Sequence, residues 1–121
     1  MDNKEFSKLL EIRTKKFAIA IILMSANLPY SIESKVIRNQ LTKSGTSIGA
    51  NYREANRSKS KADFIRKIKI CLGEASETVY WLEILIELNW LEKEKFNPIL
   101  IEANELLALF TSITHNLKLN N

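Results

Sequence analysis

The sequence predicts an all-α protein, an antiparallel up-and-down four-helix bundle made by one domain over residues 1–121. Three glycines and two prolines are too few for a turn-rich β fold. The composition, 45% hydrophobic and 26% charged, is ordinary for a globular domain, and a chain of this length buries roughly two-thirds of its unfolded surface. Apolar residues also recur every three or four positions in four long segments separated by short polar ones, which is the pattern of amphipathic helices.

The first helix is expected from about residue 2 to residue 27. Its apolar stripe consists of Phe6, Leu10, Phe17, Ala20 and Met24, widened by Leu9 and Ile21. Pro29 ends the helix, because its ring fixes φ and disfavours helical backbone at the residue before it. The most apolar run, residues 17–24, is far shorter than the roughly 20 residues of a membrane-spanning helix, so we expect it to be buried in the bundle.

The second helix is expected from Ser31, whose hydroxyl can cap it, to about residue 56. Its inner face steps by three or four residues through Ile37, Leu41, Ser44, Ile48, Tyr52 and Ala55. Small residues fill its middle, and each of the two glycines there costs about 1 kcal/mol relative to alanine. A close approach by a neighbouring helix would offset that cost. The alternative is a break at Gly45, which we favour less because no proline or Asn-Gly turn accompanies the glycines.

The third helix is expected from Ser60 to about residue 89. Ser60 and Asp63 form the Ser-x-x-acid pattern of a helix start. The inner stripe consists of Phe64, Ile68, Cys71, Leu72, Ala75, Val79, Leu82 and Ile86. Trp81, Leu85 and Leu88 add apolar surface at an angle to this stripe. This surplus indicates either a very central helix or a helix that also contacts another subunit.

The fourth helix is expected to follow the charged turn at residues 92–95, with Pro98 in its first turn, where proline is compatible with a helix. Its stripe, with alternating steps of four and three, is Ile99, Ala103, Leu106, Phe110, Ile113 and Leu117. This spacing suits the shallow crossings of a left-handed bundle.

The residue types exclude most catalytic schemes. One histidine, His115, and one cysteine, Cys71, cannot supply a zinc site or a ferritin-like dimetal site, and no glycine-rich phosphate loop occurs. The apolar neighbours of Cys71 predict a buried thiol with a raised pKa, not a nucleophile. We therefore expect no enzyme activity, no catalytic or metal-binding residues and no cofactor. The single cysteine and the lack of a signal-like N-terminus predict a cytoplasmic protein with no membrane partner.

Three carboxylates allow two interpretations. Glu74 and Glu77 share one face of the third helix, and Glu54 lies near the end of the second, which must run antiparallel beside it. The simpler interpretation is that they pair with lysines and arginines across helices or subunits. The alternative is an enzyme that uses these carboxylates with a divalent metal.

Positive charge is concentrated in one segment. Seven basic residues, against Glu54 and Asp63, give this segment a larger excess than the net charge of +4 for the whole chain; they are Arg53, Arg57, Lys59, Lys61, Arg66, Lys67 and Lys69. The positive potential should therefore gather at one end of the bundle, as binding to a phosphate backbone requires. The alternative is a solvated face that serves solubility.

The segment of residues 47–85 closely resembles the family of 23S rRNA intervening-sequence proteins; it reads SIGANYREANRSKSKADFIRKIKICLGEASETVYWLEIL. Weaker likeness extends to the FAIAII, QLTKSGTSIGAN and ELLALFTSI segments. The resemblance implies an up-and-down four-helix bundle that assembles into a homopentameric ring. A related branch of the family serves diversity-generating retroelements as an accessory protein, in which a basic ring engages nucleic acid and a reverse transcriptase.

The family signature falls on structural or interface positions: Ser47, Gly49, Ala50, Asn51, Glu54, Ser60, Asp63, Phe64, Ile65, Glu74, Glu77, Trp81 and Leu82. Many members have Ile-Ala-Glu-Gly after the asparagine, whereas this chain has Tyr52-Arg53-Glu54-Ala55, a second common variant. The subunit interface is expected at Glu54, Glu74, Glu77, Trp81, Leu85 and Leu88. The leading hypothesis is an oligomer that binds RNA or DNA through the seven basic residues, and the alternative is a ring or scaffold that binds a protein partner.

Overall fold

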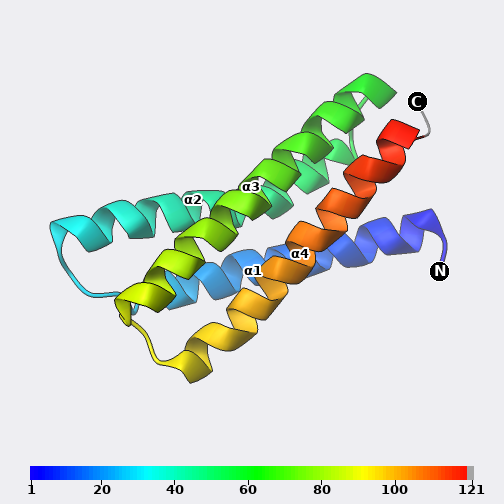
Figure 1. The fold of residues 1–121 in the computed structure, drawn as a ribbon. Coiled ribbons are helices and arrows are strands. Elements are labelled where there is room, and N and C mark those ends of the chain that lie inside the picture. The colour runs from blue at the N-terminus through cyan, green and yellow to red at the C-terminus, as the bar shows by residue number, and fades with distance from the viewer. Residues whose placement is uncertain (120–121) are drawn as a thin grey trace.

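The computed structural model describes residues 1–119, with side chains as far as Lys118, and consists of four helices joined by short segments (Figure 1). These are α1 (Asn3–Ser25), α2 (Ile32–Ala55), α3 (Lys61–Leu88) and α4 (Lys93–Leu119). Successive helices run in opposite directions, and α3 packs along both α2 and α4. The prediction of an all-α antiparallel four-helix bundle is confirmed.

The polar residues expected at helix starts do cap them. The Ser31 hydroxyl accepts a hydrogen bond from the amide of Ser34 at 3.0 Å, and the Ser60 hydroxyl accepts one from the amide of Asp63 at 3.1 Å. Asp2 caps α1 in the same way, which we had not predicted. Each cap satisfies an amide that has no partner inside its helix, and the sequence predicts the starts of α2 and α3 closely.

The predicted stripes of α2, α3 and α4 form the core. The largest fully buried side chains include Leu41, Ile48, Ile68, Leu82 and Phe110. The expectation for α1 was partly wrong, because Phe6 and Leu9 are exposed. The core face of α1 instead runs through Leu10, Thr14, Phe17, Ile21 and Met24.

Helix α2 is continuous, so the alternative break at Gly45 is wrong. A Cβ atom added at Gly45 would lie 2.9 Å from Cγ1 of Ile21, and one added at Gly49 would lie 3.0 Å from Oγ1 of Thr14. Both neighbours belong to α1. The close approach of a second helix, predicted from the small residues of α2, is therefore confirmed.

The start of α4 differs from the prediction. The helix begins at Lys93, so Pro98 is its sixth residue and lies beyond the first turn. Phe96 is buried in the core, and its amide bonds to the carbonyl of Glu92 at 3.2 Å. Burial of Phe96 explains why the helix forms a turn earlier than the proline alone would indicate.

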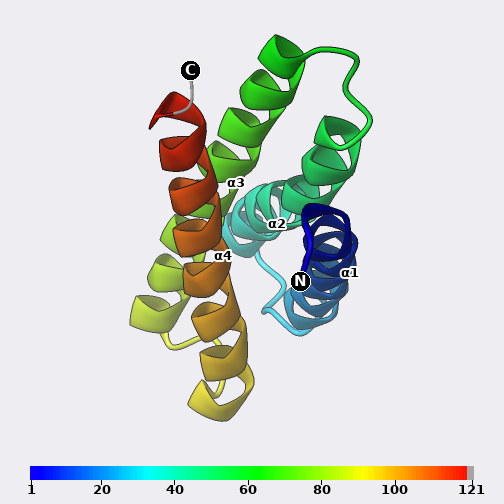
Figure 2. The same ribbon diagram turned by 90° about the vertical axis from the view of Figure 1, so that its right-hand side faces the viewer.

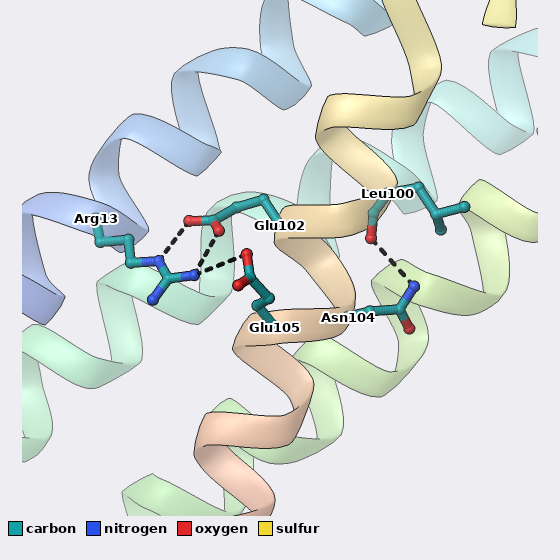
Figure 3. Close-up of polar contacts among 5 residues, drawn as sticks. All are labelled: Arg13, Leu100, Glu102, Asn104 and Glu105. Atoms are coloured by element: carbon teal, nitrogen blue, oxygen red, sulfur yellow. Dashed lines mark hydrogen bonds and ion pairs between the residues drawn. The ribbon is translucent and has the colours of Figure 1, made fainter.

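Helices α1 and α4 cross instead of running alongside each other. Figure 2 views α1 nearly end-on, while α4 runs from the bottom of the picture to the top. A polar contact joins them: the Arg13 Nε and Nη2 atoms donate to the two carboxylate oxygens of Glu102 at 2.7 and 2.6 Å, and Glu105 lies 3.3 Å from Nη2 (Figure 3). Hydrogen bonding to Glu102 raises the pKa of the Arg13 guanidinium. This pair of hydrogen bonds links two helices that pack on each other less than the other neighbouring helices do.

Candidate nucleic-acid interface

The seven predicted basic residues come from the end of α2, the segment after it and the first turns of α3. Arg53 and Arg57 line a groove between α1 and α2. Lys59 is exposed in the segment between α2 and α3, and Lys61 is exposed at the first position of α3. These four residues follow one another around the end of the bundle.

The remaining three basic residues lie on α3, where carboxylates offset two of them. Arg66 contacts Asp63 at 2.7 Å, and Lys67 lies 3.5 Å from Asp63 and 3.9 Å from Glu54. The hydrogen bond from Arg66 lowers the pKa of Asp63, so this carboxylate stays charged at neutral pH. Lys69 is exposed. Local neutralisation makes the α3 part of the predicted surface the less attractive one for phosphate.

The groove between α1 and α2 has the stronger site geometry. It has a volume of about 370 Å³, and small residues, among them Ala18, Gly49 and Ala50, line it between charged side chains. Glu11 of α1 organises one wall: its carboxylate accepts a hydrogen bond from Asn56 at 3.0 Å and lies 3.5 Å from Nε of Arg53. A small-residue floor allows a ligand backbone to approach closely.

Sequence reasoning missed the lysines that α1 contributes. Lys15 lines the same groove, and Lys4 and Lys8 line an adjoining depression that shares Glu11. The signal was present, since Lys4, Lys8 and Lys15 are spaced by four and seven residues and so share a helical face.

A third depression continues along these two helices beyond Thr46, towards the other end of the pair, and it is lined partly by Lys35, Arg38 and Lys43. The three depressions together have eight cations and two carboxylates in their walls. The cations are Lys4, Lys8, Lys15, Lys35, Arg38, Lys43, Arg53 and Arg57, and the carboxylates are Glu11 and Glu54. We call this surface the α1–α2 cationic face. Two helices of this length extend it over roughly 30 Å.

The three candidate carboxylates do not come together. Glu54 pairs with Lys67, while Glu77 accepts a hydrogen bond from Nε1 of Trp81 at 3.3 Å. Burial, and then the neighbouring charge of Glu77, raise the pKa of Glu74. Within residues 1–119 no group of three or more His, Cys, Asp or Glu side chains is placed to hold a metal ion. The residues described thus provide no centre for the metal-dependent alternative.

The predicted interface residues on α3 differ in exposure. Trp81 is half-buried and Leu88 is exposed, but Leu85 is fully buried in the core, so its side chain offers no surface to another subunit. The surplus of apolar residues on α3 is therefore explained in part by its central position.

Cys71 is also buried; its thiol donates to the carbonyl of Ile48 at 3.6 Å, and burial raises its pKa to about 12. His115 is exposed.

None of the helices in the described part of the chain combines the length and apolar character needed to cross a membrane.

Residues 9–112 match the model of a family described as 23S rRNA-intervening sequence protein. Among solved structures, a protein of unknown function from the S23 ribosomal protein family of Bacteroides thetaiotaomicron is similar, with a TM-score of 0.78 and 39% identity. The match covers 86% of this chain and 96% of that one. The comparison with curated proteins found no match.

Proposed function

Because this chain belongs to the 23S rRNA-intervening sequence protein family, we propose that it is a cytoplasmic, non-enzymatic bundle that binds structured RNA through phosphate contacts. The observation that carries the proposal is the α1–α2 cationic face, where eight basic side chains outnumber two carboxylates. Clustered lysines and arginines attract phosphates and release their counterions, largely without regard to base sequence. The exposed Lys59 and Lys61 extend this surface around the end of the bundle.

The proposal includes self-assembly into a homo-oligomeric ring, with a pentamer favoured by the family resemblance. Exposed apolar side chains support it, because Leu88 and Tyr80 of α3 and several residues of α1 lie at the surface. A ring would bring several copies of the α1–α2 cationic face to one RNA, and binding at several sites raises the overall affinity without new contacts.

RNA binding can be tested by fluorescence anisotropy with a labelled RNA hairpin at several salt concentrations between 50 and 200 mM. One variant combines Lys15→Gln, Arg53→Gln and Arg57→Gln, all in the groove. We expect at least tenfold weaker binding at low salt. The slope of log affinity against log salt should become shallower by about 2 to 3, since each phosphate contact contributes about 0.9.

The matched control combines Arg66→Gln, Lys67→Gln and Lys69→Gln, which removes three positive charges from α3. It should retain most of the binding, because two of these residues already face Asp63 and Glu54. Equal losses in both variants would show that net charge, and not the groove, governs binding. No binding by the unchanged protein at 50 mM salt would refute the proposed function, and equal affinity for a DNA hairpin would widen it to nucleic-acid backbones in general.

A further inference from the structure

Helix α1 has a second apolar stripe that faces away from the core. Leu9, Ile12, Ile19 and Leu23 are 51%, 46%, 49% and 63% exposed. With the exposed Lys16 they occupy positions separated by three, four, three and four residues, which is the spacing of a coiled-coil seam. We call these five residues the α1 outer stripe. Large apolar side chains in such an order are typical of a helix that docks against another surface.

A shallow groove of suitable chemistry lies between α3 and α4. It has a volume of about 450 Å³ and is lined by Tyr80, Glu83, Ile84, Ile86, Glu87 and Leu100. Glu83 and Glu87 are exposed, one helical turn apart. We call these six residues the α3–α4 acidic groove. Its apolar floor and paired carboxylates complement a stripe of apolar side chains interrupted by one ammonium group.

The charges also argue against each surface pairing with itself. In a symmetric antiparallel pairing of two outer stripes centred on Lys16, the two ammonium groups would face each other. Two acidic grooves brought together would oppose four carboxylates. Like charges placed together across an interface are unfavourable, whereas stripe against groove places Lys16 near Glu83 and Glu87.

We propose that the α1 outer stripe of one copy docks into the α3–α4 acidic groove of the next. This inference rests on the self-assembly part of the proposed function and gives it a specific interface. Helices α1 and α3 do not pack on each other within residues 1–119, so one copy can use both surfaces at once. Contacts between two different surfaces join subunits head to tail, and they close into a ring where the rotation permits.

A charge exchange, followed by sedimentation velocity at several concentrations, tests this interface. Lys16→Glu places a negative stripe against a negative groove, and Glu83→Lys with Glu87→Lys places a positive groove against a positive stripe. Each variant should assemble at least tenfold more weakly than the unchanged protein. The triple variant, which carries all three changes, restores opposite charges at every junction and should recover most of the assembly. Lys93→Glu, at an exposed position outside both surfaces, is the matched control and should assemble normally.

Several outcomes would overturn the interface. Unchanged assembly of Lys16→Glu and of the Glu83, Glu87 double variant would place the subunit contact elsewhere, and so would a triple variant whose defect is the sum of the two. A protein that is monomeric at all concentrations would refute both this interface and the ring. RNA binding is measured separately, and Lys16 does not line the groove that holds Arg53 and Arg57. If the unchanged protein does not bind RNA but the charge exchange restores assembly, the proposed function is therefore refuted and the interface stands.

Discussion

The three glycines illustrate what a single residue contributes and what its neighbours decide. All three lie inside helices, where glycine is unfavourable relative to alanine. Gly45 and Gly49 allow α1 to approach α2, but a Cβ atom added at Gly73 would meet no atom within 4 Å. The sequence could place all three in helices but could not distinguish them, because contact with α1 depends on which face of α2 meets it.

Gly49→Ala and Gly73→Ala should therefore change stability in opposite directions. The new methyl group at position 49 would lie 3.2 Å from the backbone carbonyl carbon of Thr14, so α1 would have to shift, with a loss of about 1 kcal/mol or more. Gly73→Ala adds helix propensity without a clash and should stabilise the protein by roughly 0.5–1 kcal/mol. Urea unfolding of both variants would measure the difference. A stabilised Gly49→Ala variant would contradict the close approach.

At the scale of elements, Arg13 links α1 to α4 where the two helices cross. Its guanidinium makes two parallel hydrogen bonds with Glu102, a geometry that lysine cannot reproduce. Arg13→Lys should lose nearly as much stability as Arg13→Ala, roughly 1 kcal/mol given that both side chains are partly exposed. A double-mutant cycle with Glu102→Ala, followed by urea unfolding, measures the coupling. Glu105→Ala, which removes one longer contact, should have less effect, and full rescue by lysine would argue against the paired geometry.

The helix pattern predicts each element but not this crossing. Arg13 and Glu102 are 89 positions apart in the chain, and nothing in the stripes of α1 or α4 indicates that they meet. The same cause explains the error at Leu9. A stripe drawn for helices that run alongside one another buries Leu9, whereas Leu9 is exposed in this bundle, where α4 crosses α1 obliquely. Apolar periodicity reports that a face is covered, but the angle at which a neighbour covers it depends on packing of the whole bundle.

For the whole molecule, basic residues that are consecutive in the chain do not all lie on the same part of the surface. The basic run from Arg53 to Lys69 crosses from one helix to the next, and the fold divides it between the α1–α2 cationic face and α3. Only Arg53 and Arg57 of the predicted set meet the lysines of α1. The sequence was sufficient for the fold because apolar spacing is a local property. The sequence was insufficient for the candidate site because that surface combines residues of α1 and α2 that are far apart in the chain.

The buried thiol of Cys71 is a built-in probe of how often the bundle opens. A thiol-specific reagent reaches Cys71 only after α2 and α3 separate. In the closed form, a pKa of about 12 leaves about one Cys71 thiol in ten thousand ionised at pH 8. Labelling of Cys71 should therefore be at least ~1,000-fold slower than that of an added thiol in a Ser76→Cys variant, whose position is exposed. Mass spectrometry of labelling time courses would compare the two rates, and similar rates would mean that the α2–α3 pair opens freely. Slower labelling with bound RNA or at higher protein concentration would then report, from one sulfur atom, how strongly each partner holds the bundle closed.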